Sequence, residues 1–130
     1  MPTPRESIAA QLRTDLVTGK PAAEAWDVYD YPFTPSEVTK PGTAVVYRTT
    51  VKRTGTHLDH ELTLQLYGRG SLGAKTEADL DSRLDDVMLS LQKLAGVEVR
   101  KAERKTFADV FQGWELDLLW VSSDIYKASI

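Results

Sequence analysis

The chain contains no cysteine. This absence excludes a disulfide framework, a thiolate zinc site and a cysteine nucleophile. It fits a protein that is made in a reducing compartment. Histidine is scarce as well, because His57 and His60 are the only two in 130 residues. The usual nitrogen and sulfur ligands of a metal site are therefore nearly missing from the sequence.

Long hydrophobic runs and an excess of positive charge are also missing. No apolar stretch approaches the roughly 18 residues that are needed to cross a bilayer. The first residues, MPTPRESIAAQ, lack the apolar segment of a signal peptide. The net charge is −3 and the pI is about 5.4, so a basic surface for nucleic acid is not indicated. We expect a protein without a membrane span that is not secreted by the usual route.

The composition is that of one ordinary folded domain. Hydrophobic residues make up 42% of the chain and charged residues 27%. At 130 residues there is room for one core and little room for two. We therefore interpret residues 1–130 as a single domain.

Two helices are predicted. In the first, Thr3 is expected to be the N-cap, with Pro4 next and Glu6 completing a capping box. In the second, Thr76 is expected to be the N-cap, and Gly96 marks the end. Apolar residues at helical spacing give each helix one buried face. They are Ile8, Leu12 and Leu16 in the first helix, and Leu80, Leu84, Val87, Met88, Leu91 and Leu94 in the second.

Alternating residues predict five strands. They lie near 26–32, 43–53, 57–67, 97–111 and 114–121, and Gly113 is expected to turn the chain between the last two. In 57–67, one face is formed by Leu58, Leu62, Leu64 and Leu66, and the other by His57, Asp59, Glu61, Thr63, Gln65 and Tyr67. The fold class is therefore predicted to be α+β, with a single mixed or mostly antiparallel sheet and both helices packed on one face.

The stretch LYGRGSLGAKTEADLD contains three glycines, Gly68, Gly70 and Gly73, in the spacing G-x-G-x-x-G. A dinucleotide site needs a buried parallel strand before such glycines, and the preceding strand here alternates polar and apolar residues. A P-loop needs lysine directly after the last glycine, where Ala74 stands. We interpret the stretch as a mobile, mildly basic loop. The alternative is a small ligand-binding or nucleotide-binding α+β domain that uses residues 68–76.

No group of residues predicts catalysis or metal binding. His57 and His60 point to opposite faces of their strand, which is wrong for shared ligation. Asp81 and Asp85 share a helix face opposite the leucines, where acids are usually solvated. Serine is not accompanied by a histidine and aspartate arrangement that would activate it. We expect no enzymatic activity, no catalytic residue, no metal and no cofactor.

The whole-chain pattern resembles the tail terminator proteins of long-tailed, siphovirus-like bacteriophages. The resemblance covers nearly the full chain. It depends on the capped first helix, the strand WDVYDYP, the proline-rich loop, the hairpin TAVVYRTTVKRTGTHLDHELTLQLYG, the glycine loop, the helix TEADLDSRLDDVMLSLQKLAG and the strand WELDLLWV. An alternative within the virion is a head-tail connector or a tail-completion adaptor.

The resemblance implies a structural virion protein at the head-proximal end of the tail, assembled in the host cytoplasm. Six copies would form a ring that caps the tail tube, stops its polymerisation and joins it to the head-side connector, while DNA passes through the lumen without sequence-specific binding. We expect the contacts with neighbouring copies and with the tube to come from residues 33–42, 52–57 and 68–75. The candidate interface residues are Phe33, Glu37, Lys40, Arg53, Thr54, His57, Arg69, Ser71 and Lys75.

Overall fold

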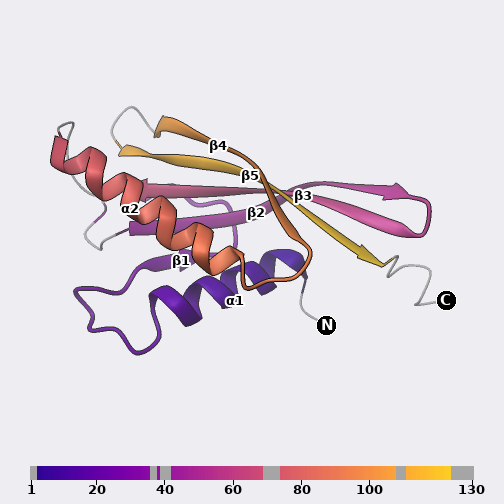
Figure 1. Cartoon of the computed structure of the whole chain (residues 1–130), viewed down its shortest axis with the longest axis horizontal. Coiled ribbons are helices and arrows are strands. Elements are labelled where there is room, and N and C mark those ends of the chain that lie inside the picture. Colours follow the sequence, from indigo (N-terminus) through magenta and orange to yellow (C-terminus); the bar gives the residue numbers. More distant parts are fainter. Residues whose placement is uncertain (1–2, 36–37, 39–41, 69–73, 108–110, 124–130) are drawn as a thin grey trace.

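The computed structural model describes residues 3–35, 38, 42–68, 74–107 and 111–123. One five-stranded mixed sheet and two helices form an α+β fold, as the sequence predicted (Figure 1). The elements, in chain order, are α1 (Pro4–Leu16), β1 (Asp27–Tyr29), β2 (Gly42–Thr54), β3 (His57–Gly68), α2 (Ala74–Leu91), β4 (Val97–Phe107) and β5 (Phe111–Ser123).

The strands lie in the order β1-β2-β3-β5-β4. The short strand β1 runs parallel to β2, and every other neighbouring pair is antiparallel. The central strand β3 is therefore antiparallel to both of its neighbours. The pairs β2–β3 and β4–β5 join strands that follow one another in the chain, as in hairpins, whereas α2 and β4 separate β3 from β5 in the sequence.

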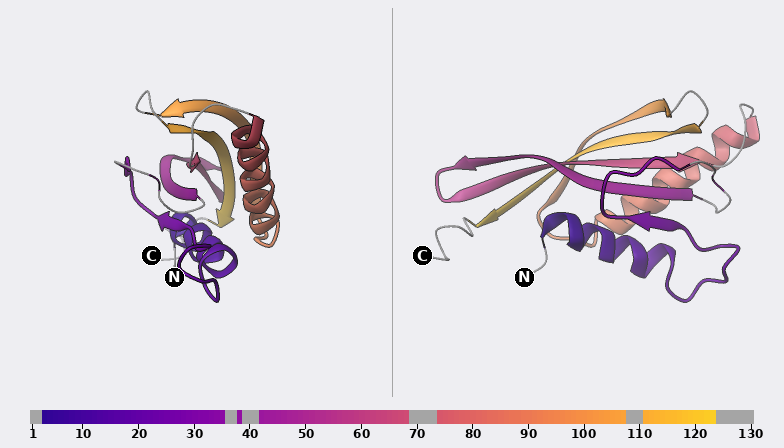
Figure 2. Two further views of the ribbon diagram at one scale, coloured as in Figure 1. Left: turned by 90° about the vertical axis from the view of Figure 1, so that its left-hand side faces the viewer. Right: turned by 180° about the vertical axis from the view of Figure 1, so that it is seen from behind.

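Both helices cover the same face of the sheet (Figure 2). Leu58, Leu62, Leu64 and Leu66 in β3 are buried, as is His60 on the same face, and the alternate residues Asp59, Glu61, Thr63 and Gln65 are more exposed. Leu116 and Leu118 of β5 pair with Leu64 and Leu62 and extend this apolar face. Ile8, Leu12 and Leu16 of α1 and Leu80, Val87 and Leu91 of α2 are buried too, as their spacing predicted.

The first helix is capped as predicted. The Thr3 hydroxyl accepts a hydrogen bond from the Glu6 backbone N–H, and the Glu6 carboxylate accepts one from the Thr3 backbone N–H. These reciprocal bonds satisfy two donors that the helix start would otherwise leave unpaired. A local sequence signal therefore fixed this helix end correctly.

Two local predictions were wrong. Helix α2 begins at Ala74, so Thr76 lies inside the helix and is not its N-cap. Alanine has the highest helix propensity, which allows the helix to start before the threonine. Gly113 is not a turn residue either, because it lies within β5 and pairs with Lys105 and Tyr67. A Cβ atom at Gly113 would lie 1.8 Å from the Leu66 carbonyl oxygen, so close backbone packing explains this glycine.

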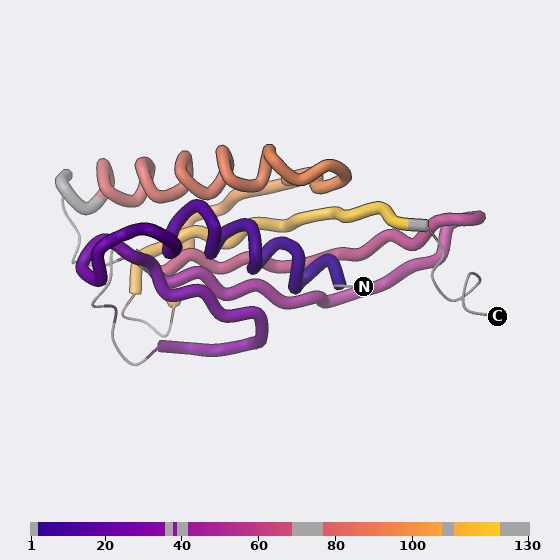
Figure 3. Tube along the Cα trace, turned by 90° about the horizontal axis from the view of Figure 1, so that it is seen from below, coloured from indigo at the N-terminus to yellow at the C-terminus, as the bar shows by residue number. Residues whose placement is uncertain are grey.

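The sheet is longer than the helices that cover it. The β2–β3 hairpin projects past the ends of both helices, and the end of β5 accompanies it (Figures 1 and 3). Irregular register near Thr49 in β2 lies between the covered and the projecting halves of that strand. Such irregularities bend and twist a strand locally. The molecule therefore has two different ends, and the candidate contact residues are distributed between them.

Candidate functional site

The projecting end of the hairpin carries three of the predicted contact residues. Thr54 pairs with His57 across the turn, and Gly55 adopts a left-handed backbone with φ of 62°. Arg53, Thr54 and His57 are all exposed. We define residues 50–57 as the hairpin tip. The tip contains Lys52 and Arg53, and the acids Asp59 and Glu61 lie across from Lys52 and Thr50 on β3, so this end of the hairpin carries charges of both signs.

A polar cluster around the buried side chain of His60 lies at the base of the hairpin tip. His60 of β3 is only 1% exposed, and its Nε2 lies 2.8 Å from the Ser122 hydroxyl of β5. Its Nδ1 lies 3.4 Å from an Arg48 guanidinium nitrogen. Burial, and secondarily the Arg48 charge, lowers the pKa of His60. The sequence correctly predicted that His57 and His60 point to opposite faces of β3. It gave no signal of the contact between His60 and Ser122, because the two residues are 62 positions apart.

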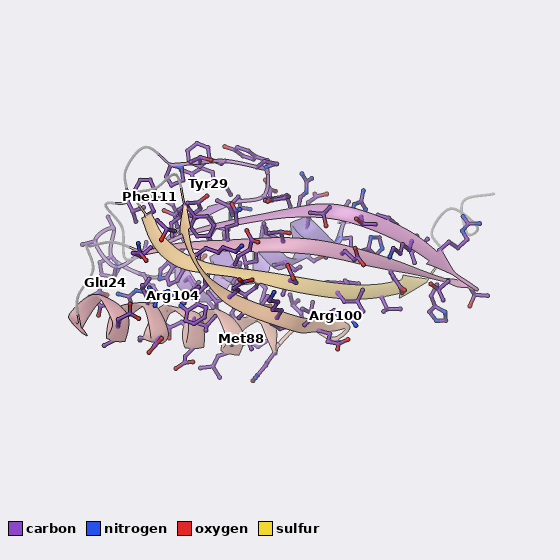
Figure 4. The ribbon with its side chains drawn as sticks, turned by 90° about the horizontal axis from the view of Figure 1, so that it is seen from above. Glu24, Tyr29, Met88, Arg100, Arg104 and Phe111 are labelled. Carbon is purple, nitrogen blue, oxygen red and sulfur yellow. The ribbon has the colours of Figure 1, made fainter. Side chains whose placement is uncertain are left out.

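Phe33 lies beside Tyr29 of β1, away from the hairpin tip (Figure 4). Its ring stacks on Tyr29 with centroids 4.2 Å apart, and Tyr31 packs edge-on against Tyr29 at 5.7 Å. Tyr29 and Phe111 lie at the same end of the sheet, away from the hairpin tip (Figure 4). Phe33, a predicted contact residue, therefore belongs to a cluster of aromatic side chains with Tyr29 and Tyr31, and Tyr31 remains 49% exposed. Exposed aromatic side chains of this kind are frequent contact anchors.

The helix-free face of the sheet is polar in its central part. Gln65 Nε2 lies 3.3 Å from Glu115 Oε2 and 3.5 Å from the Tyr47 hydroxyl. Tyr67 donates from its hydroxyl to Gln65 Oε1 at 3.1 Å. Burial, followed by the nearby Glu115 carboxylate, raises the pKa of Tyr47. The tyrosines on this face are therefore neutral hydrogen-bonding groups, which suits a surface for contact more than a site for proton transfer.

A groove lies on the opposite side of the molecule, between α1, α2 and the segment that joins α1 to β1. It encloses about 420 Å³. Its lining residues are Asp15, Leu16, Lys20, Glu24, Trp26, Arg83, Asp86, Leu89, Ser90 and Lys93. Leu89 of α2 is 61% exposed at this groove and is the most exposed large hydrophobic side chain among the described residues.

The two helices are joined by polar contacts on the floor of the groove. Asp15 of α1 accepts hydrogen bonds from Ser90 and Lys93 of α2. These contacts and a bond from Gln11 lower the pKa of Asp15 to about 2, with the Lys93 bond contributing most. Asp15 is therefore a structural anion that is already fully engaged, and the groove opens around Leu89 beside it.

Helix α2 is also attached to the far edge of the sheet. The Arg104 guanidinium of β4 donates to both carboxylate oxygens of Glu77 and lies over the Trp114 ring, 5.6 Å from its centroid. Trp114 in turn donates from Nε1 to the Leu80 carbonyl at 3.2 Å. These contacts hold the acidic face of α2 in a defined position on the sheet.

The remaining predicted contact residues give less information. Glu37, Lys40, Arg69 and Ser71 lie outside the described residues. Lys75 lies in the first turn of α2, and its side chain is outside the description. The structure therefore brings Arg53, Thr54 and His57 together at one end and places Phe33 near the other end.

The neighbourhood of the glycine loop differs from a dinucleotide site. Helix α2 begins directly after Gly73, which is closer to the glycines than expected, but β3 has antiparallel neighbours on both sides. A dinucleotide fingerprint follows a strand of a parallel sheet. A Cβ atom at Gly68 would lie 2.2 Å from Leu80 Cδ2. Packing of α2 against the end of β3 therefore explains Gly68 without a ligand.

No protein-family model matches the chain, and no curated protein matches it. Neither helix in the described part is long and apolar enough to cross a membrane. Residues 3–35, 38, 42–68, 74–107 and 111–123 contain no group of three histidine, aspartate or glutamate side chains that could hold a metal ion. The features that bear on function are therefore the exposed surfaces at the two ends of the molecule and on its helices.

Proposed function

We propose that this chain is a tail-terminator-type structural protein of a long-tailed bacteriophage. Copies of it form a ring, taken as a hexamer, on the last ring of the tail tube. The ring stops tube polymerisation and offers its other side to the head-side connector. In this role the protein acts through contacts with other proteins, and it needs neither catalysis nor a cofactor.

The projecting β2–β3 hairpin is the observation that carries the proposal. The hairpin extends past both helices, and residues 51–57 of its tip are exposed. The end of β5 pairs with β3 as far as His57, so the projection is a three-stranded part of the sheet that no helix covers, and it has fewer apolar contacts than the covered part. A neighbouring subunit that covers the tip supplies the missing burial, so this shape favours an assembly protein over an isolated monomer.

The separation of the candidate contact surfaces also supports a ring. The charged hairpin tip lies at one end of the sheet, and the aromatic cluster around Phe33 lies away from it. A closed ring requires heterologous contacts, in which one patch on a subunit meets a different patch on the next. Two chemically different ends provide distinct surfaces for such contacts and for the tube.

The charge distribution is compatible with the passage of DNA. The chain has a net charge of −3, and Glu115 and Asp117 lie on the helix-free face of β5. Phosphate groups bind surfaces that are rich in lysine and arginine. A mildly acidic subunit therefore suits a lumen that DNA traverses without binding.

Electron microscopy of particles assembled without this protein tests the proposal. Negative-stained preparations from a deletion strain are compared with wild type and with a strain complemented by the intact gene. We expect headless tubes that are longer than wild-type tails, because nothing stops their polymerisation.

The other outcomes have distinct meanings. Tails of normal length that are detached from heads would assign the chain to the connector instead. Complete particles of normal form would overturn the structural role and return attention to the loop between β3 and α2. Complementation with the intact gene must restore wild-type tails for the first result to count.

A further inference from the structure

We propose that the projecting end of the sheet opens locally when His60 takes up a proton, which makes this end a pH-sensitive device. The projecting end is defined as residues 50–54 of β2, 57–60 of β3 and 121–123 of β5. The part of the sheet under the two helices stays closed. The inference goes beyond the proposed ring and does not depend on it, because it concerns a single chain.

The boundary of the projecting end lies at the level of His60. In the sheet, His60 pairs with Val51 on one side and with Trp120 on the other. The register of β2 is irregular between residues 48 and 50, directly before this level. The pairing of β4 with β5 begins at Val97 and Trp120, so residues 121–123 lack β4 as a neighbour. An end of a sheet with neither the outer strand nor a covering helix has fewer contacts to break, so it can open while the rest stays folded.

His60 closes this boundary as a neutral side chain. An arginine side chain has no hydrogen-bond acceptor, so His60 Nδ1 is the acceptor in its 3.4 Å contact with Arg48. Nε2 therefore carries the hydrogen and donates it to the Ser122 hydroxyl at 2.8 Å. Arg48, His60 and Ser122 belong to β2, β3 and β5, so these two contacts tie the three strands together at the boundary.

A proton on His60 disrupts this arrangement. The protonated ring has an N–H group at both nitrogens, and the one at Nδ1 then points at the Arg48 guanidinium. The acceptor of the Arg48 contact is lost, and two positive charges lie side by side. His60 is only 1% exposed, so the closed form also withholds water from the charged ring.

Further cations lie on the β2 side of His60. Arg5, in the first turn of α1, lines a cavity of about 300 Å³ together with Arg48. Arg5 is 3.9 Å from Glu6, and both side chains are exposed, so this ion pair neutralises it only weakly. Arg53 pairs with Leu58, which is on the same face of β3 as His60. The surroundings on this side therefore disfavour a charged ring.

Asp59 of β3 has the opposite effect. It is next to His60 in the sequence, and its carboxylate favours the protonated ring. The strands on the other side place uncharged side chains at this level, namely Trp120 and Ser122 of β5 and Val97 of β4. Burial, followed by the Arg48 charge, outweighs Asp59 and lowers the pKa of His60.

The opened form binds the proton more readily than the closed form. In the opened form His60 reaches water and regains its ordinary pKa of 6.5, whereas its pKa is lower in the closed form. The equilibrium constant for opening therefore rises as the pH falls below 6.5. At pH 5.5 an opened His60 is about nine-tenths protonated, so the constant rises by at most about tenfold relative to pH 7.5.

Hydrogen exchange of the wild-type chain detects the local opening, with each amide rate corrected for its intrinsic dependence on pH. Strand β3 suits the comparison, because it has a paired neighbour on both sides. Amides 58–61 report on the projecting end, and amides 63–66 report on the covered part. We expect amides 58–61 to be protected at least about tenfold less than amides 63–66 at pH 7.5. Equal protection of the two groups would mean that both exchange only by unfolding of the whole chain, and would overturn the local opening.

The dependence on pH identifies His60 as the trigger. Between pH 7.5 and 5.5, the protection of amides 58–61 in the wild type should fall by about threefold to tenfold. His60→Gln should abolish this fall, because glutamine retains a donor and an acceptor but does not titrate. His57→Gln, at an exposed position of the same strand, should retain the fall.

Two results would overturn the trigger. One is a wild type whose corrected protection at amides 58–61 is the same at both pH values, a result that needs no variant to fold. The other is a fall in His60→Gln that is as large as in the wild type. Both measurements use the isolated chain, so their outcome is separate from the lengths of tails that assemble without the protein.

Discussion

The Ser90 hydroxyl of α2 donates a hydrogen bond to the Asp15 carboxylate of α1, with 2.7 Å between Ser90 Oγ and Asp15 Oδ2. Lys93 Nζ binds the other oxygen, Oδ1, at 2.9 Å. Asp15 and Ser90 are 75 positions apart in the sequence, so the Asp15 carboxylate joins two helices that are distant in the chain. A hydrogen-bonded carboxylate resists protonation, so this contact predicts a dependence of stability on pH.

The first prediction concerns Asp15. Its pKa is about 2 in the folded chain against 3.8 ordinarily, so its stabilisation is present above pH 3.8 and is lost as the pH falls toward 2. Asp15→Asn should reduce the free energy of unfolding at pH 7 by about 1 kcal/mol, because Lys93 is largely exposed. Urea unfolding at pH 7 and pH 2.5 measures this difference. The variant should lose less stability than wild type between the two values, and Asp79→Asn, an exposed control on α2, should behave as wild type.

The second prediction concerns His60. Its pKa is below 6.5 in the folded chain, so the unfolded chain binds the proton more readily. The free energy of unfolding should therefore decrease as the pH falls below 6.5, and His60→Gln should remove that part of the decrease. Urea unfolding at several pH values between 7.5 and 5 checks it. His57→Gln, at an exposed position, is the control. If the free energy of unfolding of His60→Gln decreased with pH as steeply as that of the wild type, buried His60 would not be the source of the effect.

The third prediction compares two glycines of the sheet. Gly113→Ala places Cβ 1.8 Å from the Leu66 carbonyl oxygen, a backbone atom that cannot move without breaking the β3–β5 ladder. It should cost about 3 kcal/mol. Gly68→Ala places Cβ 2.2 Å from Leu80 Cδ2 and 3.2 Å from the Gln112 carbonyl oxygen, so its closest contact is a side-chain atom rather than backbone and its cost should be smaller. Thermal unfolding followed by circular dichroism ranks the two, and equal midpoints would show that the sheet yields at Gly113.

The local pattern predicted the fold because its signals act over a few residues. Alternation in β3 assigned Leu62 and Leu64 to the buried face, and the Thr3–Glu6 capping box located the start of α1. The Gly113 prediction was wrong because a glycine signals either a turn or a close backbone approach, and only the neighbouring strand distinguishes the two.

The candidate site was less accessible from sequence, for a physical reason. The contacts that shape it join distant positions: Asp15 with Ser90, His60 with Ser122, and Glu77 with Arg104. A single sequence carries no signal for such pairs, because each partner looks like an ordinary polar residue on its own element. Arg53 of the hairpin tip and the solvated acids Asp81 and Asp85 of α2 were predicted from the sequence, but the exposed Leu89 became recognisable only with the helix placed on the sheet.

The last prediction concerns Arg104, which joins β4 to the start of α2. Its guanidinium contacts both Glu77 oxygens and lies over Trp114, a combination that lysine cannot reproduce. Arg104→Lys should therefore reduce the free energy of unfolding by about 1 kcal/mol and the thermal midpoint by about 4 °C. Arg100→Lys, the same change at an exposed position of β4, should leave the midpoint unchanged. Tryptophan fluorescence of the folded chain should also change in Arg104→Lys and stay constant in Arg100→Lys, because only Arg104 contacts the Trp114 ring. An unaltered spectrum together with an unaltered midpoint would show that α2 is held on the sheet by its leucines alone.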